Sequence, residues 1–277
     1  MRGFLNRGHP QAQGLQALWI ADQSQGNGPV WYDYCNQLPA TLTSMSTVGT
    51  NGLDSKIIAP GHNASMLFDG TGYCSAGTPS QLNFNGPAVC YACLFNAPSI
   101  STTQLILGDS NSGHTTEQGT MFLGSSNLSC EFGVGNGTIS GSTTLTSNTW
   151  ILGIIQRWGV AGGSTWNIEI LFGTTTKPMK LDFSTSSMSG SIQAQQTFSI
   201  GREGARAAAQ FAGRIAMVAA WNRRKLGAEL EDFRRLAFQG YHGFIGQTPA
   251  NRITQWYSTV PPAGGNRIRR VICSGGS

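Results

Sequence analysis

Charged side chains are scarce in this sequence. Asp, Glu, Lys and Arg make up 11% of its 277 residues, against about 25% in a typical globular protein. The deficit excludes a coiled coil, a helical array rich in Glu and Lys, and a chain kept disordered by its charge. The longest apolar runs, 151–155 and 215–221, fall far short of the roughly 18 residues that cross a membrane. We therefore expect no membrane insertion.

The sequence also lacks the spacing of a zinc or redox site. Cys90 and Cys93 belong to a set of six cysteines, and residues 88–95 around them are typical of a β-strand. Positions three apart point to opposite faces of a strand, and no second close Cys or His pair is present to complete a zinc site. Because no apolar leader follows the first arginines, we expect synthesis in the cytoplasm with free thiols.

Glycine, at 37 residues, and many Ser, Thr and Asn take the place of charge. These residues favour turns and strand edges over helices. Short β-type runs alternate with turns along most of the chain, which predicts an all-β sandwich or jelly roll of two antiparallel sheets. The expected strands are 15–21, 30–34, 65–68, 88–95, 104–107, 121–123, 128–134, 150–158, 166–172, 197–201 and 214–221.

One segment departs from this β pattern. Apolar residues recur at helical spacing across 227–239, with acidic side chains early and arginines later, as the helix dipole favours. Gly240 supplies a stop signal. We expect one short amphipathic helix packed on the sheets.

Basic residues gather toward the C-terminus. Residues 1–201 carry six basic and nine acidic side chains, and residues 202–277 carry twelve and four. Such an end could contact nucleic acid, an anionic surface or an acidic protein, but we favour a solvated helix face followed by a tail. We do not expect nucleic acid to be the partner.

The segment 266–273 reads as a β-type run that contains Arg267, Arg269 and Arg270. A strand of this kind can complete the sheet edge of a neighbouring molecule, and the arginines can orient it against an acidic partner. We take these three residues as candidate partner-binding positions. A free tail is the alternative.

Several short motifs follow one another in a recognisable order. They are Gly14-Leu15 to Trp19, Val30 to Asp33, Phe68-Asp69-Gly70, the strand 88–95, Trp150 to Ile155, Phe198 to Gly201, Phe211 to Trp221, and 222–226 leading into the helix. In this order they resemble the laminin-G-like, concanavalin-A-like jelly rolls. The resemblance implies an N-terminal arm at 1–13, a jelly roll at 14–239 and a basic C-terminal arm at 240–277.

The start of the chain adds a second resemblance. Asn6-Arg7-Gly8-His9-Pro10, leading to Gly14-Leu15, is similar to laminin-G-like proteins encoded by tailed bacteriophages. That similarity implies a non-enzymatic virion component, in the capsid decoration, a fibre or the tail. Its expected partners are other virion proteins or copies of itself, and glycans on the host surface. The alternatives are a cellular or secreted carbohydrate-binding module and, less favoured, a glycan hydrolase.

Candidate sites are few. Glycosidases of this fold place two carboxylates at alternate positions of one strand, whereas 166–172 carries only Glu169. We therefore expect no catalysis. Asp109 and Asn111, with Glu117 nearby, place oxygen ligands as the first half of a calcium loop does, or they form an Asx-rich hairpin loop.

Aromatic side chains offer a further kind of site, since they can stack on sugars. Most of them fall on expected strands, where core packing is their usual role. Trp31 and Tyr34 flank a loop instead, and we take them as the candidate glycan-stacking residues. No cofactor other than calcium is expected.

Overall fold

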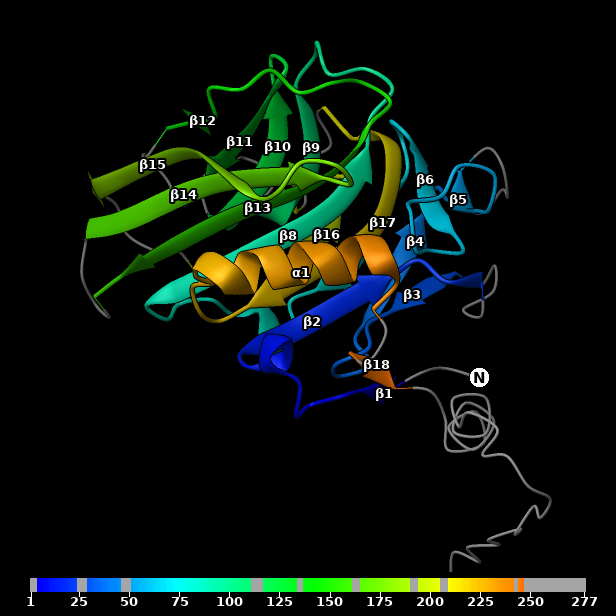
Figure 1. Cartoon of the computed structure of the whole chain (residues 1–277), viewed down its shortest axis with the longest axis horizontal. Helices are drawn as coiled ribbons and strands as arrows, with labels where there is room; N and C mark the ends of the chain where they lie inside the picture. Colours follow the sequence, from blue (N-terminus) through cyan, green and yellow to red (C-terminus); the bar gives the residue numbers. More distant parts are fainter. Residues whose placement is uncertain are drawn as a thin grey trace, which may run out of the picture. The chain divides into compact units, whose positions relative to one another are not determined.

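Two antiparallel sheets face each other in the computed structural model of the chain and form a jelly-roll sandwich (Figure 1). This architecture confirms the fold class expected from the sequence. The described residues lie in one compact unit that runs to Gly246. They are 4–23, 29–45, 51–110, 117–133, 137–160, 165–189, 194–204, 209–241 and 244–246.

The sheet beside the helix, called the helix-side sheet, has the order β15-β14-β13-β8-β17-β6-β5, and β2 also pairs with β17. Its strands are β2 (Leu15–Ile20), β5 (Gly52–Asp54), β6 (Ser65–Asp69), β8 (Ala88–Asn96), β13 (Trp150–Gly159), β14 (Thr165–Thr174), β15 (Lys180–Ser189) and β17 (Ala212–Trp221).

The opposite sheet, called the far sheet, has the order β12-β11-β10-β9-β16-β7-β4-β3. Its strands are β3 (Val30–Tyr32), β4 (Pro39–Thr43), β7 (Tyr73–Gly77), β9 (Gln104–Ser110), β10 (Glu117–Gly124), β11 (Asn127–Glu131), β12 (Ile139–Ser140) and β16 (Phe198–Ile200). A short pair, β1 (Phe4–Leu5) with β18 (Ile245–Gly246), lies outside both sheets.

Strand β8 shows why the helix-side sheet is apolar on both faces. Tyr91 and Cys93 join the core between the sheets, whereas Cys90 and Ala92 join the core under the helix. Alternate side chains of a strand point to opposite faces, so an unbroken apolar run fits a strand that is covered on both sides. The alternation also confirms that Cys90 and Cys93 face apart.

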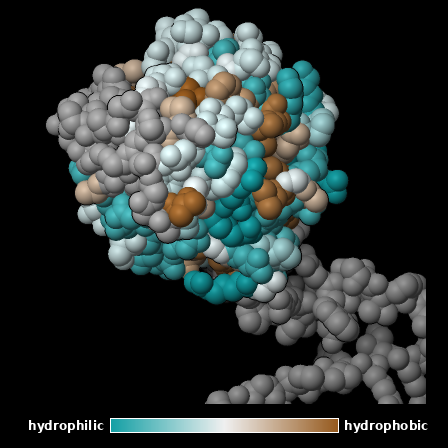
Figure 2. All heavy atoms as spheres, turned by 90° about the vertical axis from the view of Figure 1, so that its left-hand side faces the viewer, coloured by the Kyte–Doolittle hydropathy of each residue, from teal (hydrophilic) through white to brown (hydrophobic). Residues whose placement is uncertain are grey.

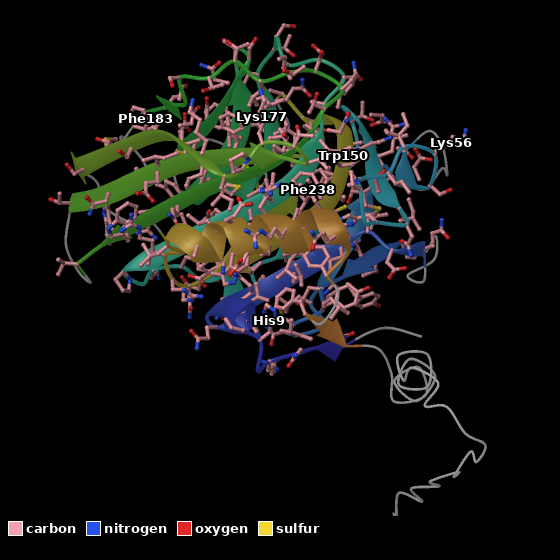
Figure 3. The ribbon with its side chains drawn as sticks, in the orientation of Figure 1. His9, Lys56, Trp150, Lys177, Phe183 and Phe238 are labelled. Atoms are coloured by element: carbon pink, nitrogen blue, oxygen red, sulfur yellow. The ribbon has the colours of Figure 1, made fainter. Side chains whose placement is uncertain are left out.

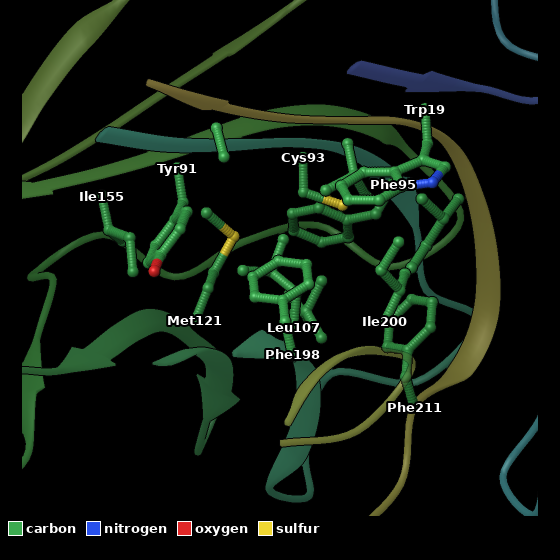
Figure 4. Packing of buried hydrophobic residues seen from close by; sticks show 14 of the residues in the cluster. Trp19, Tyr91, Cys93, Phe95, Leu107, Met121, Ile155, Phe198, Ile200 and Phe211 are labelled. Carbon is green, nitrogen blue, oxygen red and sulfur yellow. The ribbon is translucent and has the colours of Figure 1, made fainter. Parts of the chain in front are cut away.

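Aromatic rings fill the space between the two sheets (Figure 4). Trp19 stacks on Phe198 with ring centroids 5.9 Å apart, and Phe95 meets Phe211 edge to face at 6.2 Å. These contacts join β2 and β8 of the helix-side sheet to β16 and the segment before β17. The core therefore holds both sheets in one packed body.

Helix α1 (Gly227–Gln239) lies across the outer face of the helix-side sheet (Figure 1), and its bounds confirm the expected helix. Phe233 is fully buried and meets Trp221 of β17 edge to face at 4.8 Å. The helix ends at Gly240, whose φ of 84° is a left-handed conformation that glycine adopts without a steric penalty.

Residues 4–13, expected as an arm, pack instead against this helix layer. The side chain of Gln11 is buried and donates to the Glu229 carbonyl at 2.8 Å, and it accepts from Lys225 Nζ at 2.5 Å. Trp221 Nε1 donates to the Gln11 carbonyl at 2.9 Å. Burial lowers the pKa of Lys225 to about 8. The C-terminal arm was expected at 240–277, but Tyr241 and Phe244 pack in the core under the helix. Residues 247–277 lie outside the described residues.

Candidate functional site

The two aromatic residues expected to stack on sugars lie in the interior. Trp31 is 2% exposed, and its indole N–H donates to the Ile20 carbonyl at 3.0 Å. Tyr34 is 7% exposed and belongs to the core under the helix. Neither ring offers a face to solvent, so the expectation that these residues stack on a glycan is corrected: they pack the core.

Asp109, expected as a calcium ligand, instead holds the β-bulge where β10 meets β9. The carboxylate is 2% exposed, and Oδ1 accepts the backbone N–H groups of Gln118 at 2.8 Å and Gly119 at 3.0 Å. Burial raises its pKa to about 6. Asn111 and the side chain of Glu117 lie outside the described residues, within which no three His, Cys, Asp or Glu side chains gather to hold a metal ion.

Glu169 is held by neighbours on the outer face of the helix-side sheet. Gln156 Nε2 and Arg224 Nη2 each donate to its carboxylate at 2.6 Å, and the Arg224 guanidinium stacks on Trp158 at 3.5 Å. The small hollow beside it also contains Glu231. Hydrogen bonds from Arg234 lower the pKa of Glu231 to about 2, which is the wrong direction for a general acid.

A hollow that sequence reasoning missed lies on the outer face of the far sheet, and we call it the outer-sheet groove. Leu105 of β9 pairs with Phe122 of β10. Phe122 pairs in turn with Ser129 of β11, and Ser129 with Ser140 of β12. Directly paired residues share a face, so these four form one row across four strands. The groove has a volume of about 430 Å³, within the range of ligand sites.

The lining of this groove is mixed in character. Leu105 and Phe122 supply an apolar floor, and both are nearly buried. Glu131 accepts a hydrogen bond from Thr138, its neighbour on the approach to β12. The lining consists of Thr103, Leu105, Phe122, Gly124, Ser125, Asn127, Glu131, Thr138, Ser140 and Ala209. Hydroxyl, amide and carboxylate groups thus surround a small apolar floor.

A sequence signal for this groove exists in β11. Polar residues alternate with apolar ones along 127–131, and Leu128 and Cys130 face the core between the sheets. The alternation predicts a strand with one polar face. The alternation does not predict which strands lie beside β11, because strand pairing and register cannot be deduced from the sequence of one strand.

The side of the molecule that holds the ends of β13, β14 and β15 is mostly polar. Figure 2 shows it largely in hydrophilic and intermediate colours, with hydrophobic residues in a short stripe and a few separate spots. This agrees with a surface built from Ser, Thr and Gly. Among the described residues no helix is long and apolar enough to cross a membrane.

The sequence matches no family model and no curated protein. In structure, the chain is similar to domain 4 of AbnA, an extracellular GH43 arabinanase from Geobacillus stearothermophilus solved with arabinotriose. The TM-score is 0.51 at 12% identity, and the match covers 79% of this chain and 97% of that domain.

Sialidase structures from Trypanosoma rangeli are also similar. One has a TM-score of 0.53 at 13% identity, covering 82% of this chain and 34% of the sialidase. A mutant that displays trans-sialidase activity gives 0.52 at 14%, covering 86% and 36%. This chain therefore spans about a third of the sialidase length. At such identities the likeness establishes the β-sandwich fold and nothing about ligand or activity.

Proposed function

We propose that this protein is a non-catalytic, glycan-binding jelly roll carried on a virion, and that it holds the glycan in the outer-sheet groove. The observation that carries the proposal is the lining of that groove. Sugars present hydroxyl groups together with apolar C–H faces. A rim of Ser, Thr, Asn and Glu side chains around Leu105 and Phe122 matches both properties.

The absence of catalysis is part of the same proposal. Hydrolysis of a glycosidic bond ordinarily uses two carboxyl groups that flank the bond. Among the described residues that line the groove, Glu131 is the single carboxylate. A groove of this composition can hold a sugar by hydrogen bonds but has no acid and nucleophile pair.

The virion location rests on the resemblance at the start of the chain and on the neutral, polar surface. Two residues of this motif also have structural roles. His9 Nδ1 accepts a hydrogen bond from the Gln11 backbone N–H at 3.2 Å, and Arg7 Nη2 donates to the Cys35 carbonyl at 2.9 Å. Partners on the particle would be other virion proteins or further copies of this chain. A cellular or secreted carbohydrate-binding module is the alternative, and it would use the same groove.

A glycan array with two matched variants tests the binding site. Ser140→Trp fills the groove from an exposed strand position, and Ser184→Trp makes the same change at an exposed position of β15. We expect wild type and Ser184→Trp to retain the same glycans and Ser140→Trp to lose them. Equal binding by both variants, or no glycan retained by wild type, would contradict the proposal. Release of reducing ends from a bound glycan would overturn its non-catalytic part.

The location is tested separately. Mass spectrometry of purified particles should detect this chain in fixed proportion to the capsid protein, and portal, capsid and tail genes should flank its gene. A gene set in a cellular operon, with the protein absent from particles, would favour the cellular module instead.

A further inference from the structure

A second pocket, larger than the outer-sheet groove, opens where the loop before β13 meets the β14–β15 hairpin. Its volume is about 620 Å³ and it shares no lining residue with the groove. Ile151 and Phe172 form an apolar floor and are 2% and 8% exposed. Six threonines and two lysines lie around this floor, and we call the site the threonine pocket.

Some of these hydroxyls are already used. Thr174 Oγ1 accepts the Lys177 backbone N–H at 3.0 Å. Thr143 Oγ1 accepts from Lys180 Nζ at 3.3 Å and donates to Asp182 at 2.5 Å. These bonds join the loop at Thr143 to the start of β15 and close the turn between β14 and β15. One wall of the pocket is therefore preformed.

Other polar groups of the pocket have no partner among the described residues. The hydroxyls of Thr144, Thr146 and Thr176 make no hydrogen bond there, and all three residues are exposed. The Lys177 ammonium is likewise exposed and forms no ion pair within the described chain. Three hydroxyls and one ammonium therefore remain available on one rim.

The charged side chains that line the pocket have one sign. Both charged lining residues are lysines, and no carboxylate is among the described lining residues. The nearby carboxylates are engaged: Asp182 accepts from Thr143, and Glu231 accepts from Arg234 at 2.6 Å. Arg234, which is paired with Glu231, also donates to the Thr174 carbonyl at 2.7 Å.

We propose that the threonine pocket binds an acidic sugar residue, a hexuronate. Its carboxylate lies at Lys177, its hydroxyls meet Thr144, Thr146 and Thr176, and its apolar ring face rests on Ile151 and Phe172. The floor and the hydroxyl rim fit any sugar, while the ammonium with no partner on the rim selects the acidic one. This site does not depend on the outer-sheet groove.

Titration calorimetry with glucuronate, glucose and inorganic sulfate tests the assignment on the full chain. We expect glucuronate to bind, glucose to bind more weakly, and added salt to weaken glucuronate selectively. Lys177→Met should lower glucuronate affinity about tenfold, the size expected from one lost hydrogen bond to a charged group, and should leave glucose unchanged. Thr176→Val should weaken both sugars.

Lys56→Met is the matched control, because Lys56 is also exposed and lies on another side of the molecule from Lys177 (Figure 3). Glucuronate affinity equal to wild type in Lys177→Met, or no glucuronate binding at all, would overturn the proposal. Sulfate that competes as well as glucuronate would reduce the site to an anion contact and would also overturn it. Ser140→Trp should leave glucuronate binding intact. A wrong proposal for the outer-sheet groove can therefore be distinguished from a wrong proposal for the threonine pocket.

Discussion

The two outer faces of the sandwich are built from the same kind of strand but meet different surroundings. On the helix-side sheet the outer face carries Leu94, Leu152 and Ile154 and is covered by α1. On the far sheet the corresponding face of β10–β12 carries polar side chains such as Ser129 and Ser140 and lines a groove. Helix α1 therefore covers the apolar outer face of the helix-side sheet, whereas the corresponding face of the far sheet carries polar side chains around a small apolar floor.

The helix contact should be the most sensitive point of this arrangement. Phe233→Ala removes a fully buried ring that meets Trp221, and we expect a loss of about 3 to 5 kcal/mol in the free energy of unfolding. Leu226→Ala, at a position 56% exposed just before α1, should change it by less than about 0.5 kcal/mol. Urea denaturation measures both. Similar losses in the two variants would mean that α1 does not anchor on this sheet.

The free energy of unfolding should depend on pH through Asp109 of the far sheet. Burial raises the pKa of Asp109 from 3.8 to about 6, so the folded state holds this proton more tightly than the unfolded state between those values. Stability from this group is present below pH 4 and is lost as pH rises to 6, by up to roughly 3 kcal/mol.

Asp109→Asn keeps an oxygen for the Gln118 and Gly119 N–H groups and removes the titration. We expect the difference in unfolding free energy between wild type and this variant to change across pH 4–6. Bonds from Arg234 lower the pKa of Glu231 to about 2, and that group acts in both proteins, so the difference cancels it. A difference that stays flat would show that Asp109 keeps an ordinary pKa.

Sequence reasoning succeeded where one element decides the pattern. The β-type runs at β8, β13 and β17 predicted strands, and the helical period predicted α1. It missed β15, whose sequence after Phe183 is mostly Ser and Thr, because an edge strand exposed to water needs little apolar patterning. It also misplaced Trp31, since the carbonyl that its indole reaches lies on another strand.

The outer-sheet groove was out of reach for a related reason. Its floor row joins residues from β9 to β12 through register, and register depends on how turns and bulges align the strands. The bulge between Glu117 and Gly119 is one such shift. Composition predicted a polar surface, but only the pairing of strands gathers polar side chains around Leu105 and Phe122.

A smaller effect should come from the polar row itself. Ser129 Oγ donates to Ser140 Oγ at 2.9 Å, and Ser129 is fully buried. Ser140→Ala leaves the Ser129 hydroxyl without this partner and should cost about 1 kcal/mol, whereas Ser129→Ala with Ser140→Ala should be nearly neutral. A double-mutant cycle by chemical denaturation measures the coupling. Additive losses in the double variant would show that the pair contributes no coupling to the far sheet.

The smallest effect on folding is expected from the C-terminal segment. Deleting residues 264–277 removes Arg267, Arg269 and Arg270, which lie outside the described residues. The urea midpoint should stay within error of the full chain. If the segment completes a sheet edge in a neighbouring molecule, the same deletion should weaken oligomerisation or docking to the particle, because backbone hydrogen bonds between strands supply the affinity. Sedimentation of both proteins at one concentration and salt measures this, and a truncated chain that assembles normally would leave the three arginines without a role in assembly.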